Sequence, residues 1–283
     1  MKKIFTLILI LFTNSLLAVI KENAELSFEI IMNKAPSTRP MTVAYVPEFK
    51  NYYIADGGLA PVGNEAFSKS EIHVFNESGK YLKSFKPGFD NRSIYFNKKS
   101  KNLETVTYNV SSAVGFFPNT GIFKLGLDDK GLLTNKSETV SNFNSNFGSA
   151  STMPYYDSGS NQYFAKQEKS DLVVVVDAES GDIKKEIHMD LNSANVQHHD
   201  VTDHFVAFTG KKDHELVLLD VDHKEFLIFN IEGKFIGKST LPKDLKIRAK
   251  NHFNGIGYAN DMYFIYIDSA SEFGTYYGFK IFD

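Results

Sequence analysis

The segment Asp171-Leu-Val-Val-Val-Val-Asp177-Ala-Glu-Ser-Gly181-Asp-Ile-Lys-Lys-Glu-Ile187 decides the fold. Its first half is a continuous apolar run bounded by turn residues, which is typical of a strand buried on both faces. Gly181 suits the left-handed backbone conformation of a short hairpin turn. The returning half is more polar, as expected of an outer strand. The segment therefore predicts a β-hairpin with one deeply buried strand and one outer strand.

The same turn recurs at an almost constant interval along the chain. Apolar runs end in turns that carry Gly79, Gly131, Gly181 and Gly233, and these glycines are 52, 50 and 52 residues apart. A strand-rich period of about 50 residues indicates an array of repeated β units. The composition agrees, because 25 Phe and 14 Tyr residues favour strands and long helical patterns are few. We therefore expect an all-β protein.

The repeated units predict a β-propeller. We expect strands at 41–49, 52–55, 71–75 and 80–85; at 93–97, 104–108, 121–127 and 132–135; at 161–165, 172–177 and 182–187; at 196–201, 204–208, 215–220 with 226–229, and 234–239; and at 255–259, 263–268 and 276–282. The fifth unit lacks a fourth strand, whereas segment 25–31 is a spare strand ahead of the first unit. We expect this strand to complete the last blade, which closes five four-stranded blades into a ring with short edges. Six blades is the alternative, because the fourth unit is slightly long.

Residues 1–18 have the layout of a secretory signal. Lys2 and Lys3 precede an apolar run over 4–12, and Ala18 is a small residue at the expected cleavage point. The alternative is a membrane anchor, but the run is shorter than the ~20 residues that a span needs. The chain has no cysteine, so no lipid-modified cysteine follows the signal. We expect one mature domain over 19–283, located in the periplasm or secreted, with no transmembrane anchor.

Composition and motifs exclude several functions. The formal net charge of −3 gives no basic field for nucleic acid. The sequence holds no Gly-Lys phosphate loop, dinucleotide fingerprint, His-Glu-x-x-His or Gly-x-Ser-x-Gly. His198 and His199 are adjacent, and adjacent strand residues point to opposite faces, so they do not suit one metal ion. We expect a monomer with no metal site and no cofactor.

The hairpins resemble known propeller repeats. Asp171 to Ile187 resembles the repeat of YVTN-type propellers, in which an apolar strand ends in Asp and leads through a Gly turn to an outer strand. Ile72 to Phe85 and Phe226 to Lys238 are similar to the NHL-type version. The resemblance implies a propeller over most of the mature chain. These families include binding scaffolds, lactonases and other enzymes, so the resemblance does not select an activity.

Polar residues before the inner strands and after the second strands predict one small-molecule site. These residues are Arg39, Arg92, His198, His252, Asp56 and Asp268. If the repeats align, they converge at the mouth of the central channel, where two arginines suit a carboxylate or phosphate and histidines suit proton transfer. The alternative is structural: the arginines cap strand ends or pair with nearby carboxylates, and His252 lies in a solvated loop.

Two long loops carry apolar residues and predict a partner surface on the same face. Loop 57–70 contains Phe67, and loop 110–119 contains Phe116 and Phe117. Exposed apolar loop residues mark interaction surfaces, although they also suit a plug that folds into the channel mouth.

The sequence thus favours an exported binding module that holds a protein or an envelope-associated ligand. The alternative is a periplasmic hydrolase or lactonase-like enzyme with a polar site at the channel, in which Asp56 or Asp268 acts as acid, base or metal ligand. Because no catalytic signature is present, we expect binding rather than catalysis.

Overall fold

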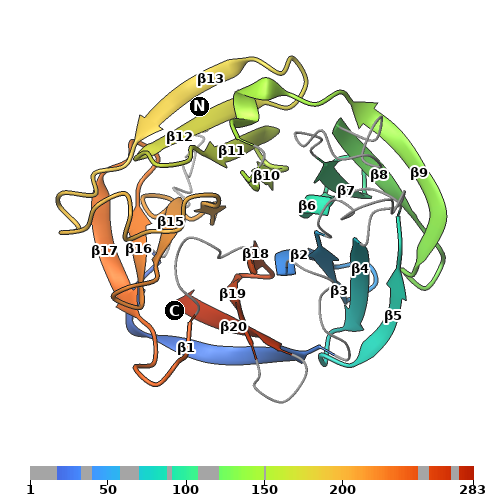
Figure 1. Ribbon diagram of the computed structural model, residues 1–283, viewed down its shortest axis with the longest axis horizontal. Coiled ribbons are helices and arrows are strands. Elements are labelled where there is room, and N and C mark those ends of the chain that lie inside the picture. Colours follow the sequence, from blue (N-terminus) through green and yellow to red (C-terminus); the bar gives the residue numbers. More distant parts are fainter. Residues whose placement is uncertain are drawn as a thin grey trace, which may run out of the picture.

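The computed structural model describes residues 18–32, 40–57, 70–87, 91–107, 121–149, 151–247, 255–268 and 274–283. Within these ranges the chain is all-β, and its helical content is the single 3-10 turn η1 (Ser145–Phe147). The sheets stand side by side around a common centre (Figure 1). No helix in the described part of the chain is both long and apolar enough to span a membrane.

Three sheets contain four strands each, in chain order. The first holds β2 (Pro40–Val46), β3 (Asn51–Asp56), β4 (Glu71–Asn76) and β5 (Tyr81–Phe85); the second holds β6 (Asn91–Asn97), β7 (Asn102–Thr107), β8 (Gly121–Leu127) and β9 (Leu133–Ser141); the third holds β10 (Tyr155–Asp157), β11 (Gln162–Lys166), β12 (Leu172–Asp177) and β13 (Ile183–His188). Neighbouring strands are antiparallel, so each sheet is a meander that runs outward from the centre.

A fourth sheet has eight strands and consists of two halves. One half is β14 (Ala207–Phe208), β15 (Leu216–Asp220), β16 (Glu225–Phe229) and β17 (Phe235–Thr240); the other is β18 (Ile256–Ala259), β19 (Met262–Ile267), β20 (Thr275–Phe282) and β1 (Ile20–Ile31). Strand β1 pairs antiparallel with β20 from Ile20 to Ile31, whereas its parallel pairing with β17 is confined to Asn23 and Thr240. The two ends of the described chain therefore lie together, and Lys21 Nζ is 2.7 Å from Asp283 Oδ1.

The four hairpin turns share one pattern of side chain to backbone hydrogen bonds and a glycine with positive φ. The first residue of each turn accepts hydrogen bonds from backbone N–H groups two to four residues further on, and the glycines have φ values of 71–82°; the first residues are Asn76, Asp128, Asp177 and Asn230. Gly79 also packs against the neighbouring half-sheet, because a Cβ there would lie 2.6 Å from the carbonyl oxygen of Glu29. Gly233 meets the carbonyl oxygen of His188 in the same way. Both backbone conformation and packing thus require glycine.

The expected strands of the fourth unit were partly wrong. Segment 204–208 supplies the inner strand β14, and 215–220 is the second strand rather than part of the third. Segment 196–201 is a series of turns with one isolated bridge, between Val201 and Asp220. The reason is a tight turn over 221–224, where Lys224 has a φ of 58° and Asp220 accepts a hydrogen bond from the His223 N–H. This turn separates two apolar runs that look like one strand in the sequence.

The inner strands meet in an apolar core. One buried cluster contains Met41, Ala44, Ile94, Met153, Phe205, Ala207, Ile256 and Tyr258, which come from the innermost part of every sheet. Because the strands alternate in direction, the β2–β3 and β4–β5 turns and their equivalents lie at one end of the ring. We call this end the turn face. The opposite end is where β3 ends and β4 begins, and where segments 167–171 and 221–224 connect the equivalent strands of the third sheet and the β14–β17 half-sheet; we call it the connection face.

Candidate functional site

Four of the nine residues selected from the sequence are described by the structure, namely Asp56, Arg92, His198 and Asp268. The other five, Arg39, His252, Phe67, Phe116 and Phe117, lie outside the described residues. Asp56 ends β3 and is 1 % exposed, and Arg92 lies half-buried in β6. His198 and Asp268 are exposed. Convergence of this set at one channel mouth therefore stays a prediction.

Asp56 belongs to a chain of polar side chains across the first sheet. In register, His73 of β4 lies opposite Ile54 and Ser84, and Asp56 lies two residues further along β3 than Ile54. Residues two apart on a strand share a face, so Asp56, His73 and Ser84 lie on one side of the sheet. His73 Nε2 is 3.5 Å from Asp56 Oδ2, and His73 Nδ1 is 2.7 Å from Ser84 Oγ. The Tyr81 hydroxyl is 3.0 Å from the same Oγ.

We call these four residues the first-sheet relay. Its inner members are desolvated, because His73 has no exposed surface and Asp56 is 1 % exposed. Its outer members, Ser84 and Tyr81, are half-buried on the outermost strand β5. A second carboxylate, Glu71 Oε2, is 3.8 Å from His73 Nδ1, and Lys86 is 3.6 Å from Glu71 Oε1.

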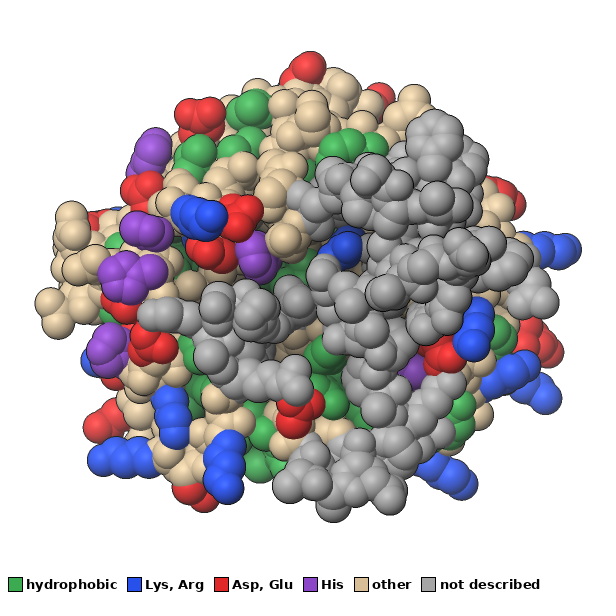
Figure 2. All heavy atoms as spheres, viewed as in Figure 1, with side chains coloured by type: hydrophobic (Ala, Val, Ile, Leu, Met, Phe, Trp, Pro, Cys, Tyr) green, Lys and Arg blue, Asp and Glu red, His purple; other side chains and the backbone are tan. Residues whose placement is uncertain are grey.

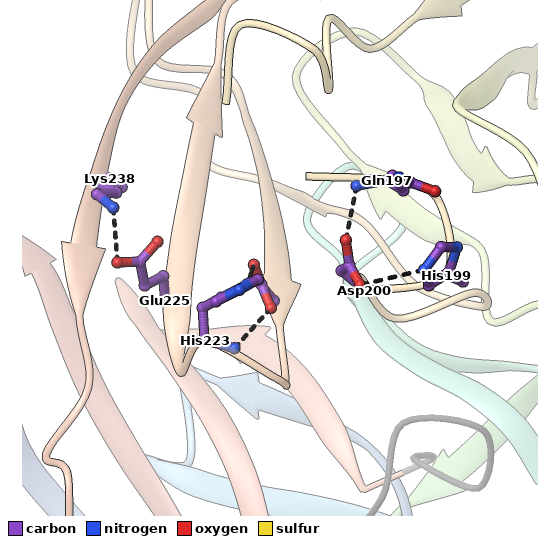
Figure 3. Close-up of polar contacts among 7 residues, drawn as sticks. Gln197, His199, Asp200, His223, Glu225 and Lys238 are labelled. Carbon is purple, nitrogen blue, oxygen red and sulfur yellow. Dashed lines mark hydrogen bonds and ion pairs between the residues drawn. The ribbon is translucent and has the colours of Figure 1, made fainter. Parts of the chain in front are cut away.

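A matching cluster lies between β15 and β16. Asp220 is opposite Glu225 there, as Asp56 is opposite Glu71 in the first sheet. Asp220 is fully buried and its Oδ2 is 2.8 Å from His223 Nδ1, while Glu225 is 2.7 Å from Lys238 Nζ (Figure 3). The bond to Asp220 raises the pKa of His223, and the charges of Asp200 and Glu225 add to this.

Histidine and carboxylate side chains continue along the surface beside this cluster. Asp200 accepts a hydrogen bond from the Gln197 N–H and lies 3.5 Å from His199 Nε2 (Figure 3). His198 lines a wide groove with His188 and Asp171, which are 3.3 Å apart. In Figure 2 several histidines gather with acidic side chains at the left of the view. Within the described ranges, no three His, Asp or Glu side chains are arranged to hold a metal ion.

A separate cavity of ≈130 Å³ lies on the axis of the ring, at the turn face. Its wall comes from β2, β6, β10, β18 and the segment before β14, and its aromatic residues are Tyr45, Tyr95, Phe96, Tyr155, Tyr156, Phe205 and Tyr258. Lys98, Asp157, Ser158 and Asn260 complete it near the turns. We call this space the axial cavity. It lies at the end of the ring opposite to the face on which the sequence-based candidates were expected.

The aromatic lining has a sequence signal that was missed. The residue before the last position of four inner strands is aromatic, at Tyr45, Phe96, Tyr156 and Tyr258. Recognition of that position required the inner strands to be aligned at their turn ends rather than at their starts. Alignment of the inner strands at their starts selects residues of the connection face instead.

Tyr155 lines the axial cavity. Its ring is half-buried, with ring centroids 6.3 Å from those of both Phe205 and Tyr258. Burial raises the pKa of its hydroxyl, which is therefore neutral at ordinary pH. Neighbouring hydroxyls have partners, since Tyr156 donates to Asn161 at 2.9 Å and Tyr258 to Asp261 at 3.5 Å. Among the described residues no hydrogen bond to the Tyr155 hydroxyl is found.

Comparison with known proteins supports the fold and no more. No family model matches the chain, and no curated protein matches it. Among solved structures, glutaminyl cyclase from Myxococcus xanthus is similar with a TM-score of 0.52 and 7% identity, over 92% of this chain and 97% of that one. At this identity the similarity concerns the fold alone, and it supports a β-propeller.

Two further structures are more distant. The periplasmic gluconolactonase PpgL from Pseudomonas aeruginosa has a TM-score of 0.40 and 13% identity, with 83% of this chain and 70% of that chain covered. A protein of unknown function from Bacteroides caccae has a TM-score of 0.36 and 16% identity, with 71% and 66% covered. The resemblance to YVTN and NHL repeats stays a prediction, because no family model matches.

Proposed function

We propose that the protein is an exported β-propeller that binds a small molecule in the axial cavity. The observation that carries this proposal is the Tyr155 hydroxyl, which sits within an aromatic wall built by the innermost part of every sheet. This hydroxyl lines the cavity and has no hydrogen-bond partner among the described residues, so it can bond to a ligand or to water. Ligand sites usually combine aromatic side chains with a few placed polar groups, and the wall of the axial cavity has both.

The proposed architecture is a ring of five blades. Support comes from three four-stranded sheets and from the eight-stranded sheet, whose halves meet at the single pair Asn23 and Thr240. In this arrangement β1 is the outer strand of the last blade and holds the ring closed through β20. We further propose one mature domain over 19–283 that acts as a monomer in the periplasm or outside the cell. The signal-like pattern of residues 1–18 supports export.

The cavity limits the class of ligand. Its volume of ≈130 Å³ is close to the ~150 Å³ of an engineered cavity that holds benzene in another protein. The ligand is therefore about the size of one six-membered ring. The aromatic side chains suit a ligand with a flat or ring-shaped skeleton. The Tyr155 hydroxyl suits a polar substituent on that ligand. Lys98 and Asp157 at the turns suit polar groups that point outward.

A thermal-shift screen with a matched pair of variants tests the proposal. The probes are glucose, benzoate, acetate and inorganic phosphate, each added to the mature chain. A ligand specific for the folded state stabilises it by about 2.7 kcal/mol at a hundredfold excess over Kd. In Tyr155→Phe we expect the affinity for the active probe to fall about twofold to tenfold, the net worth of one neutral hydrogen bond.

Tyr276→Phe is the control. Its hydroxyl donates to the Met41 carbonyl at 2.9 Å, and Tyr276 is not part of the cavity wall. We expect this variant to lose stability and to keep the affinity of the parent. The proposal is contradicted if no probe shifts the parent, or if Tyr155→Phe and Tyr276→Phe bind the active probe equally well.

A further inference from the structure

The first-sheet relay contains a histidine that the fold does not require. The position three residues before the hairpin turn is apolar in three other sheets or half-sheets, at Leu125, Val174 and Leu227. His73 occupies the same position in β4. An apolar residue there carries no desolvation cost, whereas a buried imidazole between carboxylates does. The relay therefore calls for an explanation other than packing.

One tautomer of His73, with its proton on Nε2, matches the arrangement of a serine nucleophile and its base. Asp56 Oδ2 lies 3.5 Å from Nε2, so the ring proton on Nε2 points toward a carboxylate. Nδ1 is then the acceptor, and the Ser84 hydroxyl donates to it at 2.7 Å. At 3.5 Å this contact is an ion-pair distance and not a hydrogen bond, and catalytic contacts of this kind often shorten once a substrate is bound. Serine, histidine and aspartate thus stand in the order nucleophile, base and orienting acid.

Tyr81 supplies a fourth group. Because the Ser84 proton is directed to His73, the Tyr81 hydroxyl donates to Ser84 Oγ across 3.0 Å. A carbonyl carbon bonded to Oγ brings its own oxygen next to this donor. A tyrosine hydroxyl in such a place stabilises the negative charge that develops on the oxygen. Ser84 and Tyr81 are the half-buried members of the relay, so the nucleophile lies nearer to solvent than its base.

We propose that Ser84 is an activated nucleophile that accepts acyl groups from small esters. Ser84 Oγ forms a bond to the ester carbonyl carbon while its proton passes to His73 Nδ1, and Tyr81 donates to the oxyanion. The bond to the leaving alcohol then breaks, and the proton on Nδ1 moves to the alcohol oxygen, which leaves an acyl ester on Ser84. Water attacks this ester, gives its proton to His73, and releases the carboxylic acid as Ser84 recovers a proton.

Asp56 is a positioning residue in this scheme, since it acts through His73 and does not touch the ester. The site is separate from the axial cavity, because the cavity wall contains no relay residue. A failure to label Ser84 would therefore not contradict ligand binding in the axial cavity, and absence of ligand binding there would not contradict the reactivity of Ser84.

Covalent labelling tests the proposal directly. The probe is an alkyl fluorophosphonate, which forms an Oγ–P bond with an activated serine as the P–F bond breaks and fluoride leaves. We expect one adduct per chain by intact mass, mapped to Ser84 by peptide mass spectrometry, and none in Ser84→Ala. Ser137→Ala is the matched control, because Ser137 is an exposed serine on the outer strand β9 opposite Leu125. We expect it to label like the parent.

Two further variants separate a reactive site from a structural network. Tyr81→Phe keeps the ring packing and removes the donor, and Asp56→Asn keeps the size of the side chain. We expect each to slow labelling by at least ~10-fold, the lower range of what acid–base and oxyanion groups contribute. Asp56→Asn should also move the pH at which the labelling rate is half-maximal. If Asp56 had only a structural role, the folded molecules of this variant would show the same half-maximal pH as the parent. The proposal is overturned if Ser84 labels no faster than Ser137, or if Tyr81→Phe labels like the parent.

Discussion

The first sheet and the β14–β17 half-sheet carry the same pair of carboxylates in opposite settings. Asp56 faces Glu71 and Asp220 faces Glu225 at equivalent positions, and each pair has one histidine and one lysine beside it. In the first sheet the histidine is a strand residue with no exposed surface. In the half-sheet it is a turn residue, His223, whose side chain is 57% exposed.

The difference shows how the position of one residue decides the role of a buried carboxylate. The carboxyl oxygens of Asp220 contact the backbone N–H and the ring of His223, so a local turn satisfies the buried group. Asp56 instead faces a histidine from the next strand, which in turn reaches Ser84 on the outer strand. The turn histidine, His223, contacts a carboxylate of its own turn. The strand histidine, His73, instead links a carboxylate on one neighbouring strand to a serine on the other.

The largest expected difference is in stability. We expect His73→Ala to lower the free energy of unfolding by about 2–5 kcal/mol, because removal of a side chain with no exposed surface leaves a cavity in the sheet. We expect His223→Ala to lower it by less than ~1 kcal/mol, because its ion pair is largely exposed. Urea denaturation of both variants, followed by circular dichroism, measures the two values. Equal losses in the two variants are incompatible with the distinction between strand and turn histidines.

The hairpin turns should behave alike in the two regions. Gly79 and Gly233 both have positive φ and both face a neighbouring carbonyl oxygen. We expect Gly79→Ala and Gly233→Ala each to cost at least ~1–2 kcal/mol, the strain of a left-handed non-glycine residue. Thermal unfolding of the two variants checks this. If either substitution leaves the stability unchanged, the turn at that glycine relaxes to accept alanine. The first sheet and the half-sheet would then differ in their turns as well as in their histidines.

The smallest expected effect is a pH dependence confined to the half-sheet. Asp220 raises the pKa of His223, so the pair stabilises the folded state below the unfolded histidine pKa of about 6.5 and loses this effect as pH rises through the higher folded pKa. The stability gap between the parent and His223→Gln should be under ~1 kcal/mol at pH 6 and smaller still at pH 9. Unfolding midpoints at the two pH values measure it. A gap that widens toward pH 9 contradicts the raised pKa.

Much of the fold follows from the sequence because the turns carry a local chemical signature. An Asn or Asp three or four residues before a Gly marks each hairpin, because its side chain accepts hydrogen bonds from the backbone of the turn, as at Asn76 and Asp177. The fourth unit was divided wrongly because the 221–224 turn lacks glycine and depends on Asp220. A turn that is held by an Asp side chain and contains no glycine is hard to recognise in the sequence when apolar runs lie on both sides of it.

The candidate sites were harder to predict, because they depend on register between strands. Asp56 was selected from its place at a strand end, but His73 and Ser84 join it only through cross-strand pairing. The axial cavity depends on five segments that meet at the centre, and no single segment signals it. Tyr155 looks like an ordinary strand tyrosine in the sequence.

The most direct test of the proposed function is a crystal structure of the mature chain with the probe that gives the largest thermal shift. We expect the probe between the aromatic walls of the axial cavity, with a polar atom about 2.7–3.0 Å from the Tyr155 hydroxyl oxygen. A probe bound at another place, or a cavity filled by a rotated Tyr155 ring, would contradict the proposal.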